Sequence, residues 1–128
     1  MSKVSFHILR VGISVTFIWI GVLILKSPES WGGYLQPWAV KLLPFGISQA
    51  MISTALLDII IGVFLLVDWL TWLAASLGTI HLIIVLLVSG ISDITIRDIG
   101  LLAGTIAILI DSLPFYFKRL FIKARRSP

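Results

Sequence analysis

Long apolar stretches separated by short polar segments dominate the chain. A helix needs about 20 consecutive apolar residues to cross a bilayer, because it rises about 1.5 Å per residue and the hydrocarbon is about 30 Å thick. Four stretches are long enough, at about residues 4–25, 47–67, 69–88 and 98–117. The pattern therefore predicts an all-α integral membrane protein in which residues 1–128 form one transmembrane domain, a four-helix bundle.

The first stretch also has features of a secretory signal peptide, since Lys3 and Arg10 come before or early in an apolar run. No pair of small residues that would mark a cleavage site follows this run. Instead, Lys26 and Pro28 follow once the run has reached a length that spans the bilayer. We therefore predict an uncleaved first transmembrane helix.

The connections between the predicted helices differ greatly in length. A tight turn around Asp68 joins the second and third stretches, so these helices should be antiparallel neighbours. The loop over residues 26–46 is the longest, and two interpretations of its segment 34–44 remain open. One is a short helix in the membrane interface, with Trp38, Leu42 and Leu43 facing lipid, which can act as a lid over an outward-facing cavity. The other is an ordinary loop anchored by aromatic residues.

The composition excludes several classes of function. The chain is 59% hydrophobic and 12% charged, with a mean hydropathy of +1.10, which is too apolar for a soluble domain of this size. The net charge of +4 does not indicate nucleic-acid binding, because half of the basic residues follow Phe117 rather than forming a basic face. Cysteine is absent, and the two histidines lie in different predicted helices. Disulfides, thiolate catalysis, iron–sulfur ligation and a metal site built by the chain are therefore not expected.

Basic residues predict the orientation of the bundle. Seven lie on the side of both termini and three on the other side: Lys3, Arg10, Lys118, Arg119, Lys123, Arg125 and Arg126, against Lys26, Lys41 and Arg97. The positive-inside rule then places both termini in the cytoplasm of a multi-pass protein of the cell (plasma) membrane. The basic tail 118–128 is expected to lie on anionic lipid, with docking of a cytoplasmic partner as the alternative. Aromatic residues are expected at both interfaces, Trp31, Tyr34 and Trp38 outside and Trp69, Trp72, Phe115, Tyr116 and Phe117 inside.

Four ionisable residues lie well inside the hydrocarbon by their position in the apolar stretches: Arg10, Asp58, His81 and Asp111. Each costs about 2.5 to 3.5 kcal/mol on insertion scales and is therefore expected to face inward with a partner. Helical rise places Arg10 and Asp111 at a similar depth near the inner boundary, where they can form an ion pair. The alternative is that Arg10 reaches the headgroups and that Asp111 is hydrated.

Asp58 and His81 lie near the bilayer midplane, on helices that should be neighbours. We expect a hydrogen-bonded pair, although His81 bonded to a backbone carbonyl or a threonine is the alternative. A carboxyl group at this depth is too short to reach water, so Asp58 is the first candidate for a binding or proton-handling site.

The fourth stretch begins with a charged pair at the outer side, Arg97 and Asp98. Asp98 suits a helix N-terminus because of the helix dipole, and this role is favoured over a ligand-binding role. Small residues recur along the third and fourth stretches, at Ala74-x-x-x-Gly78, Gly100-x-x-x-Gly104 and Ala103-x-x-x-Ala107. Such spacing is typical of helix contacts, either inside the bundle or between the two copies of a homodimer.

Several short motifs resemble the DoxX family of small four-helix membrane proteins: Arg10-x-Gly12, Gly21 and Lys26, then Asp58-x-x-x-Gly62, and the segment from Arg97 to Leu109. The family includes the small subunit of thiosulfate:quinone oxidoreductase. The resemblance implies a non-catalytic membrane subunit associated with a membrane or peripheral oxidoreductase, with quinone as the candidate cofactor. It makes Arg10, Asp58, Arg97 and Asp98 the family-like polar positions, whereas His81 belongs to no such motif. The absence of cysteine argues against thiol relay through this chain.

Two other functions remain open on the residues alone. A carrier would use Asp58 and His81 as a proton-coupled site and would need to dimerise to enclose a path. A structural or assembly protein would use the buried charges only to fix the register of its helices.

Overall fold

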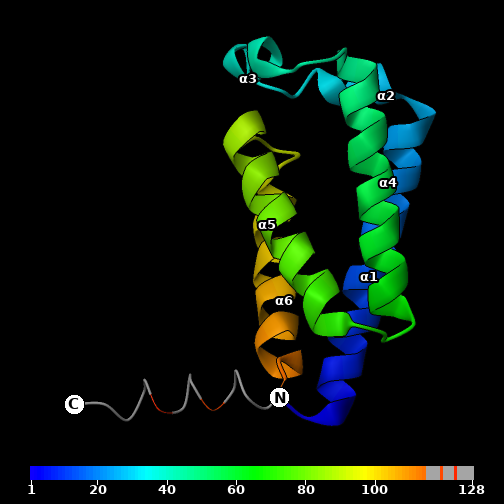
Figure 1. The fold of residues 1–128 in the computed structure, drawn as a ribbon, viewed down its shortest axis with the longest axis vertical. Coiled ribbons are helices and arrows are strands. Elements are labelled where there is room, and N and C mark those ends of the chain that lie inside the picture. Colours follow the sequence, from blue (N-terminus) through cyan, green and yellow to red (C-terminus); the bar gives the residue numbers. More distant parts are fainter. Residues whose placement is uncertain (115–118, 120–122, 124–128) are drawn as a thin grey trace.

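The fold is described from a computed structural model for residues 1–114, Arg119 and Lys123. These residues contain helices and no strand, which confirms the all-α prediction (Figure 1). The six helices are α1 (Lys3–Lys26), α2 (Pro28–Gly32), α3 (Pro37–Leu42), α4 (Ile47–Leu66), α5 (Thr71–Ser89) and α6 (Ile96–Ser112).

Three of the described helices, α1, α4 and α5, are long and apolar enough to cross a membrane. Their bounds agree with the first three predicted stretches to within two residues. The fourth prediction ran from 98 to 117, whereas α6 ends at Ser112, and its last turn, its interfacial aromatic residues and most of the basic tail lie outside the described residues. The structure therefore supports a helical membrane protein, and the fourth crossing stays a prediction.

The long helices form two pairs that meet at one end only. α1 packs along α4, and α5 packs along α6. The pairs lie close together where the turn between α4 and α5 joins them and spread apart toward α2 and α3 (Figure 1). We call these the closed end and the open end of the bundle. The N-terminus lies at the closed end (Figure 1).

The turn between α4 and α5 ends α4 with a Schellman motif. Asp68 adopts a left-handed conformation with φ of 55°, and its N–H donates to the Leu65 carbonyl at 3.3 Å. The N–H of Trp69 donates to the Phe64 carbonyl at 3.2 Å, and the two rings pack with their centroids 5.3 Å apart. These are the bonds and the apolar contact that define the motif. A second left-handed residue, Leu70 with φ of 49°, then starts α5 after this short connection.

Glycines set the spacing between α1 and α4. A Cβ at Gly21 would lie 2.8 Å from the Ala55 carbonyl oxygen, and one at Gly62 would lie 2.9 Å from the Ser14 carbonyl oxygen. Each helix thus brings a glycine against the backbone of the other, the packing expected where lipid offers little drive for association. This contact explains the glycine of the Asp58-x-x-x-Gly62 motif, which sequence analysis had noted only as a resemblance.

The predicted small-residue contacts of α5 and α6 are confirmed in part. A Cβ at Gly104 would meet Ile13 of α1 at 2.6 Å, and one at Gly78 would meet Phe17 at 3.3 Å. By contrast, Gly100 has no atom within 4 Å of such a Cβ, and Ala103 is exposed. Only one edge of α6 therefore packs inside the bundle.

Side chains near the closed end form the main core. It is centred on Phe17, Ile61, Leu65, Ala75 and Ile108, each at most 2% exposed. The outward faces carry large apolar side chains, such as Trp19, Ile60, Ile80, Leu87 and Ile110, which are 50 to 66% exposed. An apolar surface on every long helix is suited to contact with lipid rather than water.

Candidate ligand-binding site

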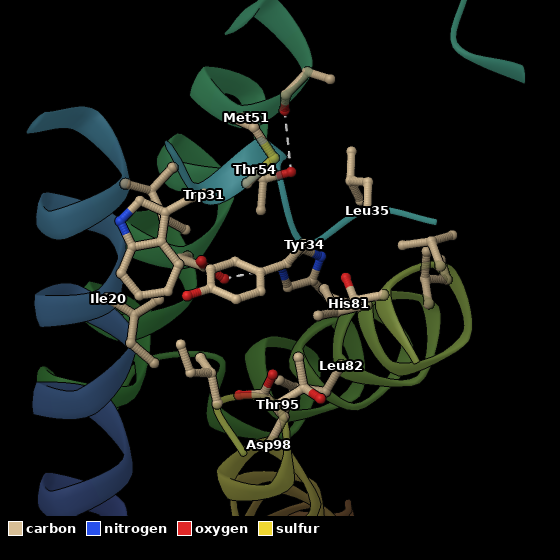
Figure 2. A pocket seen from close by; sticks show the side chains of 18 of the residues that line it. Ile20, Trp31, Tyr34, Leu35, Met51, Thr54, His81, Leu82, Thr95 and Asp98 are labelled. Carbon is tan, nitrogen blue, oxygen red and sulfur yellow. Dashed lines mark hydrogen bonds and ion pairs between the residues drawn. The ribbon is translucent and has the colours of Figure 1, made fainter. Parts of the chain in front are cut away.

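A cavity of about 270 Å³ lies between the two helix pairs toward the open end. Its walls are mainly apolar and include Phe17 and Ile20 of α1, Met51 of α4, and Leu82 and Val85 of α5. It exists because α4 and α5 diverge from their tight turn, so the side chains that fill the core near the closed end no longer meet (Figures 1 and 2). Its size is close to the lower limit for ligand pockets, about 300 Å³.

Asp58 and His81 form a bonded pair in the wall of this cavity. His81 Nε2 lies 2.9 Å from Asp58 Oδ1, and the two side chains are 11% and 6% exposed. Asp58 comes from α4 and His81 from α5, so the pair bridges the two halves of the bundle. The predicted pair is therefore confirmed, and both residues line the cavity.

Each member of the pair retains a polar atom beyond their shared bond. Among the described residues, neither Asp58 Oδ2 nor His81 Nδ1 has a hydrogen-bond partner. No fully buried side-chain nitrogen or oxygen in the described part of the chain lacks such a partner, so both atoms keep some accessible surface. This surface is available to a molecule in the cavity.

Asp98 brings a third acidic or basic side chain to the cavity from α6 (Figure 2). The residue is only 7% exposed, and its Oδ1 lies 3.7 Å from Nε of Arg97. The predicted role of Asp98 at the N-terminus of a helix is confirmed in position only. Asp98 lies in the first turn of α6, but no side chain forms a capping hydrogen bond there. The carboxylate lines the cavity instead, because the first turn of α6 faces α4 and α5 where the pairs diverge.

The segment between α1 and α4 covers the open end of the cavity. The N–H of Gln36 donates to the Val88 carbonyl at 2.8 Å, and its side-chain amide donates to the Ser89 carbonyl at 3.3 Å. On the other side, Gly32 packs against Ile47 of α4. The segment is therefore attached to both helix pairs and forms a roof, with Trp31 and Tyr34 among the lining residues (Figure 2).

Two aromatic rings and one cation hold this roof against α6. The rings of Trp31 and Tyr34 lie 5.9 Å apart, and the Arg97 guanidinium lies 5.4 Å from the centre of the Trp31 ring. The short helix predicted within residues 34–44 is confirmed as α3, and Trp38 and Leu42 are 52% and 74% exposed as expected. The prediction for Leu43 was wrong, because this residue lines the cavity rather than facing lipid.

Arg10 and Asp111 lie away from the cavity, and the predicted ion pair between them is wrong. Arg10 is bonded to the end of α4, where Nη1 donates to the carbonyls of Leu65 and Leu66 at 2.6 and 2.7 Å. Its Nε lies 3.8 Å from Asp68. Asp111 lies 3.7 Å from the amine of Met1. Helical depth alone could not show that Arg10 bonds the terminal carbonyls of α4 rather than the Asp111 carboxylate.

Sequence reasoning missed several lining residues. Thr54 precedes Asp58 by one helical turn and so shares its face of α4, a signal that was available from spacing alone. The inward position of Trp31 and Tyr34 carried no such signal, because aromatic residues near a membrane boundary ordinarily anchor the interface. Within the described residues, no three histidine, aspartate or glutamate side chains are placed to hold a metal ion.

Comparison with models of known protein families, with curated proteins and with solved structures found no match to this chain. The resemblance to the DoxX family stays a prediction that rests on the motifs alone. A mainly apolar lining with a few polar groups, here the His–Asp pair beneath an aromatic roof, is typical of small-molecule sites.

Proposed function

We propose that this chain binds a membrane-soluble ligand of the quinone class in the cavity and serves as a small membrane subunit associated with an oxidoreductase. The observation that carries the proposal is the Asp58–His81 pair, with its 2.9 Å separation, in the wall of a mainly apolar cavity. The implied kinship with the DoxX family belongs to the same proposal.

The pair gives His81 a defined role in binding. When Asp58 accepts the Nε2–H, it fixes the tautomer and the orientation of the ring, and Nδ1 remains for the ligand. A neutral Nδ1 accepts a hydrogen bond from a ligand hydroxyl, whereas a protonated Nδ1 donates to a ligand carbonyl. The neutral ring therefore favours a hydroxyl-bearing ligand, and the protonated ring favours a carbonyl-bearing one.

The proposal includes four membrane crossings with both termini in the cytoplasm. The 17 residues of α6 extend for about 26 Å at the usual helical rise, which is close to the hydrocarbon thickness of about 30 Å. The excess of basic residues on the side of the termini supports this orientation. The cavity then lies in the outer half of the bilayer, within reach of ligands dissolved in lipid.

A binding experiment in lipid nanodiscs tests the proposal. Decylubiquinone is titrated into the reconstituted protein, and tryptophan fluorescence reports binding through Trp31 in the roof. We expect saturable quenching that the Trp31→Phe variant largely removes. We expect His81→Leu to weaken binding at least about fivefold, the equivalent of one lost hydrogen bond.

The matched control is Ser53→Ala, because Ser53 is exposed on the same helix as Asp58 and bonds only its own backbone turn. This variant should bind as the unmodified protein does. Quenching that does not saturate, or that His81→Leu leaves unchanged, would contradict the proposal. Pull-down of the native protein in mild detergent, followed by mass spectrometry, tests the oxidoreductase partner separately.

A further inference from the structure

The polar atoms that the inner cavity offers to a ligand are hydrogen-bond acceptors. His81 Nδ1 accepts while Nε2–H is bonded to Asp58, and Asp58 Oδ2 accepts when the carboxyl group is ionised. The Thr54 hydroxyl donates its hydrogen to the Ala50 carbonyl at 3.1 Å, so that only its oxygen lone pairs remain. The ion-paired carboxylate of Asp98 adds two further acceptor oxygens.

The donors among the lining residues belong to the rim and the roof. Arg97 is already engaged by the Asp98 carboxylate and the Trp31 ring, and its side chain is 42% exposed. Trp31 and Tyr34 lie in the roof segment (Figure 2). The hydroxyl of Thr95 is satisfied locally, since it donates to the Gly90 carbonyl at 2.6 Å and accepts from the N–H of Ser92 at 2.8 Å. The acceptors around the Asp58–His81 pair therefore come from the long helices, whereas the donors come mainly from the roof segment and from Arg97.

We infer that the cavity selects the reduced, hydroxyl-bearing form of its ligand, a hydroquinone, over the oxidised quinone. This inference rests on the proposed function. A hydroquinone brings two O–H donors to the acceptors of His81 and Asp98, which come from α5 and α6 and are directed into the same space (Figure 2). A quinone carries carbonyl oxygens at these positions, which leaves acceptors facing acceptors with no hydrogen between them.

A buried site distinguishes strongly between ligands that carry hydroxyl donors and ligands that lack them. A site built to bond a hydroxyl rejects an analogue without it, because its polar groups lose their partners away from water. Asp58 and Asp98 are 4% and 7% exposed, so water has little room to take the place of a missing ligand hydroxyl. The hydroquinone should therefore bind at least about tenfold more tightly than a ligand of the same shape without donors.

The test compares three ligands that share a ring and a tail: dodecylhydroquinone, dodecylbenzoquinone and the dimethyl ether of the hydroquinone. Binding is measured anaerobically by tryptophan quenching in nanodiscs, and empty nanodiscs correct for partition into lipid. We expect the hydroquinone to bind at least about tenfold more tightly than the ether or the quinone. The ether is the sharpest comparison because it cannot be oxidised and differs only in its donors.

Asp98→Asn should affect the two ligands in opposite directions, a result that only the pairing of donors with acceptors predicts. The amide adds an N–H donor at the same position, so binding of the hydroquinone should weaken and binding of the quinone should strengthen, which lowers their ratio at least about threefold. Asp93→Asn is the matched control, because Asp93 is exposed in the preceding loop. If Asp98→Asn fails to fold, Thr54→Val removes another acceptor with little change of shape and should lower the same ratio.

The outcomes separate the two proposals. Failure of all three ligands to bind would refute the proposed function and this inference together. Equal binding of the three ligands, or tighter binding of the quinone, would overturn the inference and leave a quinone-class site in place. A ratio that Asp98→Asn and Thr54→Val leave unchanged would overturn it as well.

Discussion

Arg10 offers the sharpest test of the fold, because the structure gives it a role that differs from the one the motifs implied. Its guanidinium donates to the last carbonyls of α4, those of Leu65 and Leu66, at 2.6 and 2.7 Å. The residue is 8% exposed. Carbonyls at a helix C-terminus have no partner inside the helix, and the helix dipole favours a cation there. We therefore predict that Arg10→Met destabilises the contact of α1 with α4.

The magnitude follows from the bonds that are lost. A hydrogen bond to a charged group contributes about 1.5 to 3 kcal/mol, so the two carbonyl bonds account for about 3 to 6 kcal/mol. The contacts of Arg10 with His7 Nδ1 at 3.2 Å are lost as well. Because the site lies near the end of the bundle, water can replace part of this contribution, and we expect a loss of about 2 to 4 kcal/mol. Arg10→Lys should recover only part of it, because an ammonium group lacks the planar fork of donors. Asp68→Asn should cost less than about 1 kcal/mol, since Asp68 is 41% exposed and its contact with Arg10 is 3.8 Å long.

Unfolding by sodium dodecyl sulfate in mixed micelles, followed by far-UV circular dichroism, measures these free energies. Lys3→Met is the matched control, because Lys3 is exposed near the start of the same helix. A loss for Arg10→Met no larger than that for Lys3→Met would refute the capping role. Ligand affinity gives a second readout, because Arg10 does not line the cavity, and its variants should change the dissociation constant less than about twofold.

Two further predictions concern helix packing. Gly62→Ala should destabilise the bundle by about 1 to 3 kcal/mol, because the new Cβ would meet the backbone of α1. Gly12→Ala, with no atom within 4 Å, should stay within about 1 kcal/mol of the unmodified protein in the same unfolding assay. The hydroxyls of Thr79 and Thr105 lie 3.1 Å apart, and a double-mutant cycle of their valine variants should give a coupling of about 0.6 kcal/mol, as hydrogen bonds between membrane helices do. No coupling would mean that the bond is not formed.

The sequence predicted the helices well because their signal is local. Twenty consecutive apolar residues are sufficient to indicate a spanning helix, and α1, α4 and α5 follow that rule. The Asp58–His81 pair was predicted for a related reason, since two polar groups at the same depth on consecutive helices have few other partners. The span of α6 is harder to predict from the sequence. Its charged first turn and its shorter length weaken the apolar signal.

The cavity could not be predicted, because it depends on the angle between the helix pairs. That angle follows from contacts made by particular side chains, such as Gly78 against Phe17 and Gly104 against Ile13. The partner of Arg10 was missed for a different reason. A depth count treats side chains as the only polar groups, whereas the terminal carbonyls of α4 can also accept hydrogen bonds from a side chain. Backbone ends must therefore be counted among the partners of any charge within a membrane.

The helix packing that holds the closed end together also determines where the cavity forms. The Schellman turn, Arg10 and the core around Phe17 hold the closed end together, and α4 and α5 diverge from it (Figure 1). Asp58 and His81 lie where the helices are still near enough to bond and already far enough apart to leave space above them. A polar pair placed nearer the turn would be enclosed in the core, and one nearer the roof would be too far apart to bond. The position of the Asp58–His81 pair along α4 and α5 therefore allows the two residues to bond each other and to line the cavity as well.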